Sequence, residues 1–268
     1  TAPAYENWLG GIQGKQVPTQ HPGKEGFIKI PTQKENLTFF FTYQINHMYW
    51  RYFLWNFVGR QNDIQGHGEP EHGNWITGIP FFDNLRLGNQ NLLPESLRHN
   101  KGHNVFYALP LLLGLIGIIW QLSQGKKGKQ QFNILFFLFF MTGIAIVIYL
   151  NQAPLQPRER DYAYAGSFYA FAIWIGLGSA GLCEILRKKN SSVLPVCLYM
   201  LFCLLIPLQM ASQTWDDHDR SGRYTCRDFG SNYLMTLSEK GYPIIFCQGD
   251  NDTFPLWYNQ DTEGMRRD

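Results

Sequence analysis

The sequence predicts a mainly α-helical protein: a polytopic membrane helix bundle with external loops and the start of a soluble α/β region at the C-terminal end. Three observations support this fold class. Four apolar segments each have about the length needed to cross a hydrocarbon core of roughly 30 Å. Two of these segments are each followed closely by three basic residues. Aromatic residues make up 16% of the chain, and many flank the segments as in membrane-interface belts. The segments are residues 104–121, 132–150, 167–186 and 193–210.

These four segments have to be helical, because lipid offers no hydrogen-bonding partner to free peptide groups. Residues 132–150 carry no charged side chain, and the only charge in the other three is Glu184, near an end. A pump or ion-coupled transporter normally needs ionisable groups inside the membrane, so their absence argues against that class. We therefore assign residues 104–211 to the membrane and expect the chemistry at the boundary between lipid and water.

The chain before the bundle divides into three parts. Residues 1–37 are rich in Gly, Pro, Gln and Lys and are expected to form an external loop. Residues 38–58 are dense in aromatic side chains, but Arg51 lies in the middle. This favours a helix lying at the membrane interface, although the length also allows a fifth span. Residues 59–103 form a polar external loop whose four histidines match no metal-ligand spacing.

The basic clusters predict the orientation of the bundle. Lys126, Lys127 and Lys129 follow the first segment, and residues 187–189 (Arg-Lys-Lys) follow the third. Alternation of the spans puts both clusters on one face, which the positive-inside rule makes cytoplasmic. The N-terminal region, the short connection between the second and third spans, and residues 212–268 are then periplasmic.

The short external connection carries an unusual run of charges. Arg158 and Arg160 alternate with Glu159 and Asp161. Basic residues in a short external loop run against the positive-inside rule. One interpretation is a self-neutralising surface turn. The other is a site for an anionic headgroup, because the planar guanidinium group can grip phosphate oxygens in pairs.

The C-terminal region predicts the opening of an α/β unit. We expect an amphipathic helix over residues 227–240, a short buried strand over 243–247, an acidic turn, and a further helix starting near Phe254. The turn contains Asp250, Asn251 and Asp252. Carboxylates at this spacing can share a divalent cation, but a turn and capping role explains the same residues, so no metal is assigned.

The five cysteines form no clear disulfide framework. Cys226 and Cys247 lie in the polar C-terminal region, and they could pair if that side of the membrane is oxidising. The net charge of +2 is too small to suggest a nucleic-acid partner. Because the chain begins Thr-Ala-Pro and ends directly after a helical pattern, we expect it to be an internal fragment of a longer protein.

Three long strings of the chain are distinctive: YWRYFLWNFVGRQND (residues 49–63), RERDYAYAGSFYAFAIWIGLG (158–178) and GDNDTFPLWY (249–258). They resemble a family of multi-span membrane proteins from Bacteroidetes, formerly of unknown function. That family is grouped with the protein O-mannosyltransferases of glycosyltransferase family 117. The resemblance covers most of the chain, from about residue 34 onward.

The resemblance implies a GT-C-type architecture in the bacterial inner membrane. It implies a sugar donor linked to a polyprenyl phosphate, mannose-like in type, and secreted acceptor proteins with a free hydroxyl. Arg158 and Arg160 are then candidates for binding the donor phosphate, with Glu159 and Asp161 orienting them. In GT-C enzymes the catalytic carboxylate lies in the first external loop, so we expect it upstream of this sequence. The alternatives are a non-catalytic membrane scaffold and a component of a lipid or polysaccharide flippase.

Overall fold

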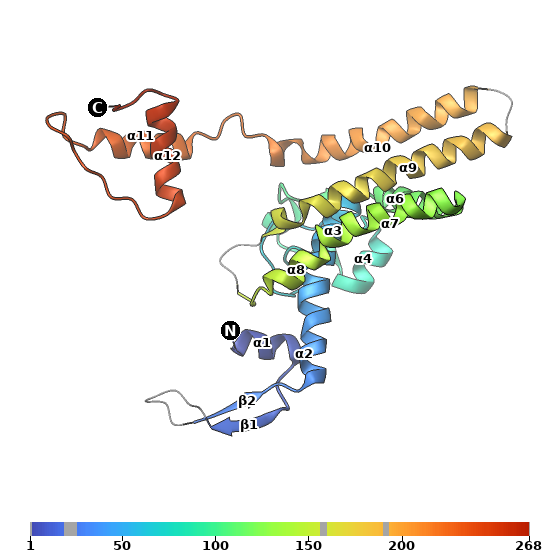
Figure 1. The fold of residues 1–268 in the computed structure, drawn as a ribbon, viewed down its shortest axis with the longest axis horizontal. Coiled ribbons are helices and arrows are strands. Elements are labelled where there is room, and N and C mark those ends of the chain that lie inside the picture. The colour runs from blue at the N-terminus through green and yellow to red at the C-terminus, as the bar shows by residue number, and fades with distance from the viewer. Residues whose placement is uncertain (1, 19–25, 156–159, 190–192, 268) are drawn as a thin grey trace. The chain divides into compact units, whose positions relative to one another are not determined.

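The structure, a computed structural model, describes residues 2–18, 26–155, 160–189 and 193–267 (Figure 1). It is mainly helical, as the sequence predicts. The chain divides into two compact units, Thr1–Asp217 and His218–Asp268. The first unit contains all the long apolar helices.

The N-terminal part is more ordered than the predicted loop. Helix α1 covers Ala2–Leu9, and strands β1 (Lys15–Pro18) and β2 (Phe27–Ile30) form an antiparallel hairpin in which Lys15 lies opposite Ile30. Thr32 then starts the next helix. Its backbone N–H donates to the Glu35 carboxylate over 2.7 Å, and the Glu35 backbone N–H donates back to the Thr32 hydroxyl over 3.3 Å. This reciprocal capping box fixes where the helix begins.

The aromatic segment forms one continuous helix in three parts, α2 (Gln33–Phe39), the π-helical η1 (Phe40–Trp50) and α3 (Arg51–Phe57). Arg51, which argued against a span, is buried. Its guanidinium group donates to the Gly73 carbonyl over 3.0 Å and lies 4.8 Å from the centres of the Tyr52 and Trp55 rings. The charge is therefore satisfied within the protein.

The polar loop after this helix is held by a short antiparallel pair, β3 (Gly59–Arg60) with β4 (Asn104–Val105). Between these strands lie α4 (Pro80–Leu87), the 3₁₀-helical η2 (Gln90–Leu92) and α5 (Glu95–Arg98). The β3–β4 pair brings both ends of the loop to the point where the first apolar helix starts.

Three helical stretches among the described residues are long and apolar enough to cross a membrane: Gly125–Leu150, Asp161–Lys188 and Leu194–His218. They contain α7 (Gly125–Met141), α8 (Ile144–Leu150), η3 (Asp161–Tyr164), α9 (Ala165–Lys189) and α10 (Leu194–His218). The protein is therefore a membrane protein. The expected span over residues 104–121 differs from the helix observed, because residues 104–105 belong to β4 and the apolar helix α6 runs only from Leu109 to Ser123.

Helices α6 and α9 pack backbone against backbone. A methyl group at Gly117 would collide with the carbonyl group of Trp174, and one at Gly178 would collide with the carbonyl of Leu113. Small residues at such a contact let two membrane helices approach closely. The indole of Trp174 also donates to the Gln121 side chain over 2.8 Å, which satisfies a buried polar pair between the same helices.

The aromatic helix packs against the bundle at the break between α7 and α8. The break falls at Thr142 and Gly143. A side chain at Gly143 would meet the hydroxyl of Tyr49 and the Cβ of Ser167. Tyr49 is fully buried and lies against the rings of Phe139 and Tyr164. The core of the first unit is therefore an aromatic cluster where three helices meet.

Helix α10 is attached to the rest of its unit through polar contacts at its C-terminal end. The Gln209 amide donates to the Val105 carbonyl over 2.7 Å, and the Val105 N–H donates to the Gln213 side chain over 2.6 Å. One turn further on, the Asp217 carboxylate pairs with Arg60 at 2.7 Å.

The second unit contains two helices, α11 (Thr225–Met235) and α12 (Asp250–Asp261). The predicted strand over residues 243–247 is not formed, and Ile244 and Phe246 are exposed rather than buried. A strand needs a neighbouring strand to bind its peptide groups, and within the described part of this unit there is none. Of the predicted start of an α/β unit, the described structure therefore contains the helices but not the strand.

Candidate functional site

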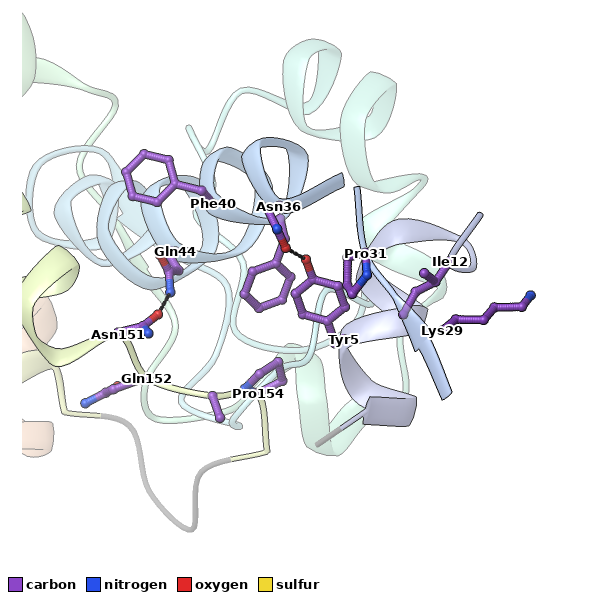
Figure 2. A pocket seen from close by; sticks show the side chains of 12 residues that line it. Tyr5, Ile12, Lys29, Pro31, Asn36, Phe40, Gln44, Asn151, Gln152 and Pro154 are labelled. Atoms are coloured by element: carbon purple, nitrogen blue, oxygen red, sulfur yellow. Dashed lines mark hydrogen bonds between the residues drawn. The ribbon is translucent and has the colours of Figure 1, made fainter. Parts of the chain in front are cut away.

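A cavity of about 610 Å³ lies between the N-terminal region and the segment that follows α8 (Figure 2). Residues from α1, the hairpin, the aromatic helix and the chain after α8 line it. They are Tyr5, Ile12, Lys29, Pro31, Asn36, Phe39, Phe40, Gln44, Asn151, Gln152, Ala153 and Pro154. The lining thus combines aromatic rings with side-chain amides.

The backbone at the end of α8 positions one of these amides. Asn151 ends the helix in the left-handed conformation, with φ of 40°. Asparagine tolerates this conformation better than most residues with a side chain. Its side-chain oxygen accepts a hydrogen bond from the Gln44 amide of the aromatic helix, and Figure 2 shows the two side chains pointing toward each other. The wall of the cavity is therefore tied together across 107 residues of sequence.

The opposite wall is built in the same way. The Tyr5 hydroxyl donates to the Asn36 side chain over 2.5 Å, and its ring lies 4.3 Å from that of Phe39. Tyr43, which is not part of the lining, donates to the carbonyl of the lining residue Ala153 over 3.3 Å. Aromatic faces and fixed amides thus converge on one space.

The cavity is almost uncharged. Among the described residues that line it, Lys29 is the charged one, and in Figure 2 the lysine side chain extends away from the other labelled groups. Both polar atoms of the Gln152 amide are buried without a hydrogen-bond partner in the described structure, and in Figure 2 this amide points away from the other labelled groups. A buried amide requires partners, so Gln152 would bind a polar group of a ligand by turning its side chain toward the cavity. The site favours a neutral, polar molecule over a free anion.

His47 lies one turn along the aromatic helix from this cavity and is held neutral. Its ring is 4.8 Å from that of Trp8 and 5.8 Å from that of Tyr43, and its Nε2 atom lies 3.1 Å from the Gly66 carbonyl oxygen. Burial, aided by the charge of Arg51, lowers the pKa of His47 to about 3. It is therefore uncharged at neutral pH.

The charged loop begins directly after the cavity. Pro154 belongs to the cavity lining, and Arg160 and Asp161 follow within a few residues, both exposed. Asp161 starts η3. Arg158 and Glu159, the other two predicted site residues, lie outside the described residues. The charged loop therefore follows the cavity lining closely in sequence. Of its two arginines, Arg160 is described by the structure, and it lies at the surface.

The acidic turn of the second unit is the first turn of α12. The helix begins at Asp250, with Gly249 before it at φ of 85°, and not near Phe254 as predicted. Asp250 and Asn251 line a separate cavity of about 510 Å³, whereas Asp252 does not. Acidic side chains in the first turn are stabilised by the helix dipole. No cluster of three or more potential metal ligands occurs in the described ranges, and Cys226 and Cys247 are free thiols.

Sequence reasoning missed the residues of the first cavity. Gln44, Asn151 and Gln152 were not singled out, because amides beside apolar segments are common. The available signal was their position: Asn151 and Gln152 directly follow an uncharged span, and Gln44 interrupts an aromatic run. No feature of either segment indicated that Gln44 and Asn151 lie close together in the fold.

Comparison with known proteins covers the second unit only. Residues 226–268 match the family model described as TMEM260-associated domain 2. No curated protein and no solved structure matches the chain. The C-terminal region is thus similar to a domain associated with TMEM260.

Proposed function

We propose that this chain is part of a membrane glycosyltransferase that moves a mannose-like sugar from a polyprenyl-phosphate donor to a hydroxyl group of a secreted protein. The reaction takes place on the periplasmic side of the inner membrane, within a GT-C-type bundle. The cavity lined by amides and aromatic rings, whose lining segment is followed in sequence by the charged loop, carries this proposal. It supports a neutral, polyhydroxylated ligand next to a separate binding place for phosphate.

The two halves of the donor have different chemical needs. A pyranose presents hydroxyl groups, which pair with amides such as Gln44 and Gln152, and an apolar face, which packs on rings such as Phe40. The phosphate needs positive charge. The described lining of the cavity offers Lys29 alone, so we assign this role to Arg158 and Arg160. Glu159 and Asp161 hold the two guanidinium groups in place.

The reaction is a displacement at the anomeric carbon. The acceptor hydroxyl oxygen forms a bond to C1, and the bond between C1 and the phosphate oxygen breaks. The phosphate leaves with the bonding electrons, and a carboxylate takes the hydroxyl proton. Positive groups at the phosphate stabilise the charge that develops there. The residues named above bind and orient the donor, while the general base is a separate group.

The proposal is tested by transfer assays on the full-length protein reconstituted in vesicles, with polyprenyl-phosphate mannose and an acceptor peptide. We expect Arg160→Ala to raise the KM for the donor about tenfold, which corresponds to about 1.4 kcal/mol of lost phosphate binding. Arg160→Lys should restore part of the loss, because it keeps the charge without the planar fork. Gln152→Leu should also weaken donor binding.

Arg98→Ala is the matched control, since Arg98 is an exposed arginine in the other external loop. It should leave the donor KM unchanged. Transfer that is absent from the wild-type protein with several lipid-linked sugars would overturn the enzyme proposal and favour the scaffold. Transfer that is present but insensitive to Arg160 and Gln152 would remove only the assigned roles.

A further inference from the structure

Helix α4 presents a set of large apolar side chains to the outside of the first unit. Phe81 is 74% exposed, Phe82 is 55% exposed and Leu85 is 82% exposed. Ile79 before the helix and Leu92 after it are exposed as well. We call these five residues the α4 surface. A contiguous apolar patch of this kind is unusual on a water-facing surface and marks an interaction site.

The opposite side of α4 is pinned by polar contacts, so the helix cannot roll its apolar side inward. The buried Asp83 carboxylate accepts hydrogen bonds from the Thr77 and Gly78 backbone N–H groups, each over 2.8 Å. The Arg86 guanidinium group lies 3.8 Å from the centre of the Trp75 ring. These contacts of the loop therefore keep the α4 surface exposed.

The loop places this surface at the level where the apolar helix α6 begins. Gly78, just before α4, is packed so closely against Val105 and Tyr107 that a methyl group there would collide with the Val105 side chain. Tyr107 is half exposed and precedes α6 by two residues. Leu112, one turn into α6, is also exposed. Exposed apolar side chains thus occur both at the start of α6 and on α4, and the residue before α4 that contacts Val105 and Tyr107 brings the two places close together.

The surroundings fit the boundary of a bilayer. Trp75 and Tyr107 are amphipathic rings of the kind enriched at that depth, and the basic residues Arg98 and Lys101 lie in the same loop. A short helix with one apolar side and basic neighbours typically lies in the plane of the interface.

We propose that α4 is an interfacial anchor: its surface inserts into the outer region of the leaflet in which α6 begins, so that its partner is lipid. The anchor fixes the height of the polar loop above the membrane. This inference rests on the first unit alone and does not depend on the proposed transferase activity.

The test measures depth by fluorescence quenching in the full-length protein, with the native cysteines replaced by alanine. Phe82→Cys and Leu85→Cys are labelled with an environment-sensitive fluorophore and reconstituted in phosphatidylcholine and phosphatidylglycerol vesicles. Glu71→Cys is the matched control, because Glu71 is exposed in a turn of the same loop. We expect lipids carrying a quencher at a shallow chain position to quench the labels at 82 and 85 at least threefold more than the label at 71.

Two results would overturn the proposal. Equal, weak quenching at all three positions, with water-like emission, would show that the surface faces solvent. Blue-shifted emission that persists in detergent and is insensitive to lipid-borne quenchers would show that a protein surface, including a second copy of this chain, covers α4. A second experiment checks that the bulky labels do not cause the result. Phe82→Trp in the otherwise native protein should be protected from aqueous acrylamide in vesicles. Full access of acrylamide to this indole would likewise contradict the anchor.

Discussion

At the scale of single residues, His47 shows how burial sets the charge of a side chain. Its ring is packed between aromatic side chains, and Arg51 lies on the next turn of the same helix. Both effects disfavour the imidazolium form. The pKa of about 3 lies well below the ordinary value of 6.5, so the unfolded chain binds a proton between these values that the folded chain does not bind.

His47 should therefore make the protein less stable as the pH falls. Its contribution to stability is complete above pH 6.5 and is lost progressively toward pH 3. The slope for one group is at most about 1.4 kcal/mol per pH unit. We expect the thermal midpoint in detergent to fall between pH 7 and pH 5, and His47→Gln, which can still donate to the Gly66 carbonyl, to show a smaller fall. An equal fall in both proteins would mean that other groups control the acid response.

At the scale of elements, the contact between α6 and α9 depends on glycine at particular positions. Gly117 and Gly178 lie where the two backbones touch, whereas a methyl group at Gly176 would meet no atom within 4 Å. The same helix, α9, therefore contains a glycine at a close backbone contact, Gly178, and a glycine in open space, Gly176.

We expect Gly178→Ala to destabilise the bundle by about 1–3 kcal/mol, because the methyl group forces the two helices apart. Gly117→Ala should have a similar effect from the other side of the contact. Gly176→Ala serves as the control and should leave the stability unchanged. Thermal or denaturant unfolding in detergent micelles, compared between the three variants, measures the difference. Equal losses at Gly176 and Gly178 would contradict the close approach.

How far the elements could be predicted depends on how local their causes are. The uncharged span over residues 132–150 is an intrinsic property of its composition, and the structure contains it within Gly125–Leu150. The prediction of a strand over residues 243–247 was wrong, because a short apolar run forms a strand only where a neighbouring strand exists to pair with it. The start of α12 was placed too late, because Pro255 suggested a first turn and instead lies inside the helix.

The candidate cavity could not be predicted from the local sequence, for a related physical reason. Its walls come from α1, the aromatic helix and the segment after α8, which meet only because the aromatic helix packs against the bundle at Gly143. Gln44 and Asn151 are ordinary amides until that packing brings them together. The arginine loop could be identified from the sequence, since its charges stand out in an external connection.

At the scale of the first unit, polar contacts join the C-terminal end of α10 to the polar loop. The ion pair between Arg60 and Asp217 joins the polar loop to the end of this helix, and both side chains are largely shielded from solvent. Losing one partner of a shielded pair leaves the other charge unpaired, which costs more than the pair itself contributes.

Asp217→Asn should therefore loosen the C-terminal end of α10. Hydrogen exchange of the amides over residues 209–217 measures this, and we expect faster exchange in the variant than in the wild-type protein. Asp216→Asn is the matched control. Asp216 is exposed and lies one position earlier, and its substitution removes the same charge. If both variants exchange alike, the effect is one of net charge and the ion pair is not what holds the helix.

The length of α6 has a consequence for the lipid around the protein. Its fifteen residues extend roughly 22 Å, less than the hydrocarbon thickness of about 30 Å. Tilting would only shorten its reach across the bilayer further, because tilting relieves a helix that is longer than the hydrocarbon thickness. If α6 crosses the membrane, as the sequence predicts, we expect the bilayer to thin beside it, at a cost of a fraction of a kcal/mol per Å, and lipids with shorter acyl chains to collect there.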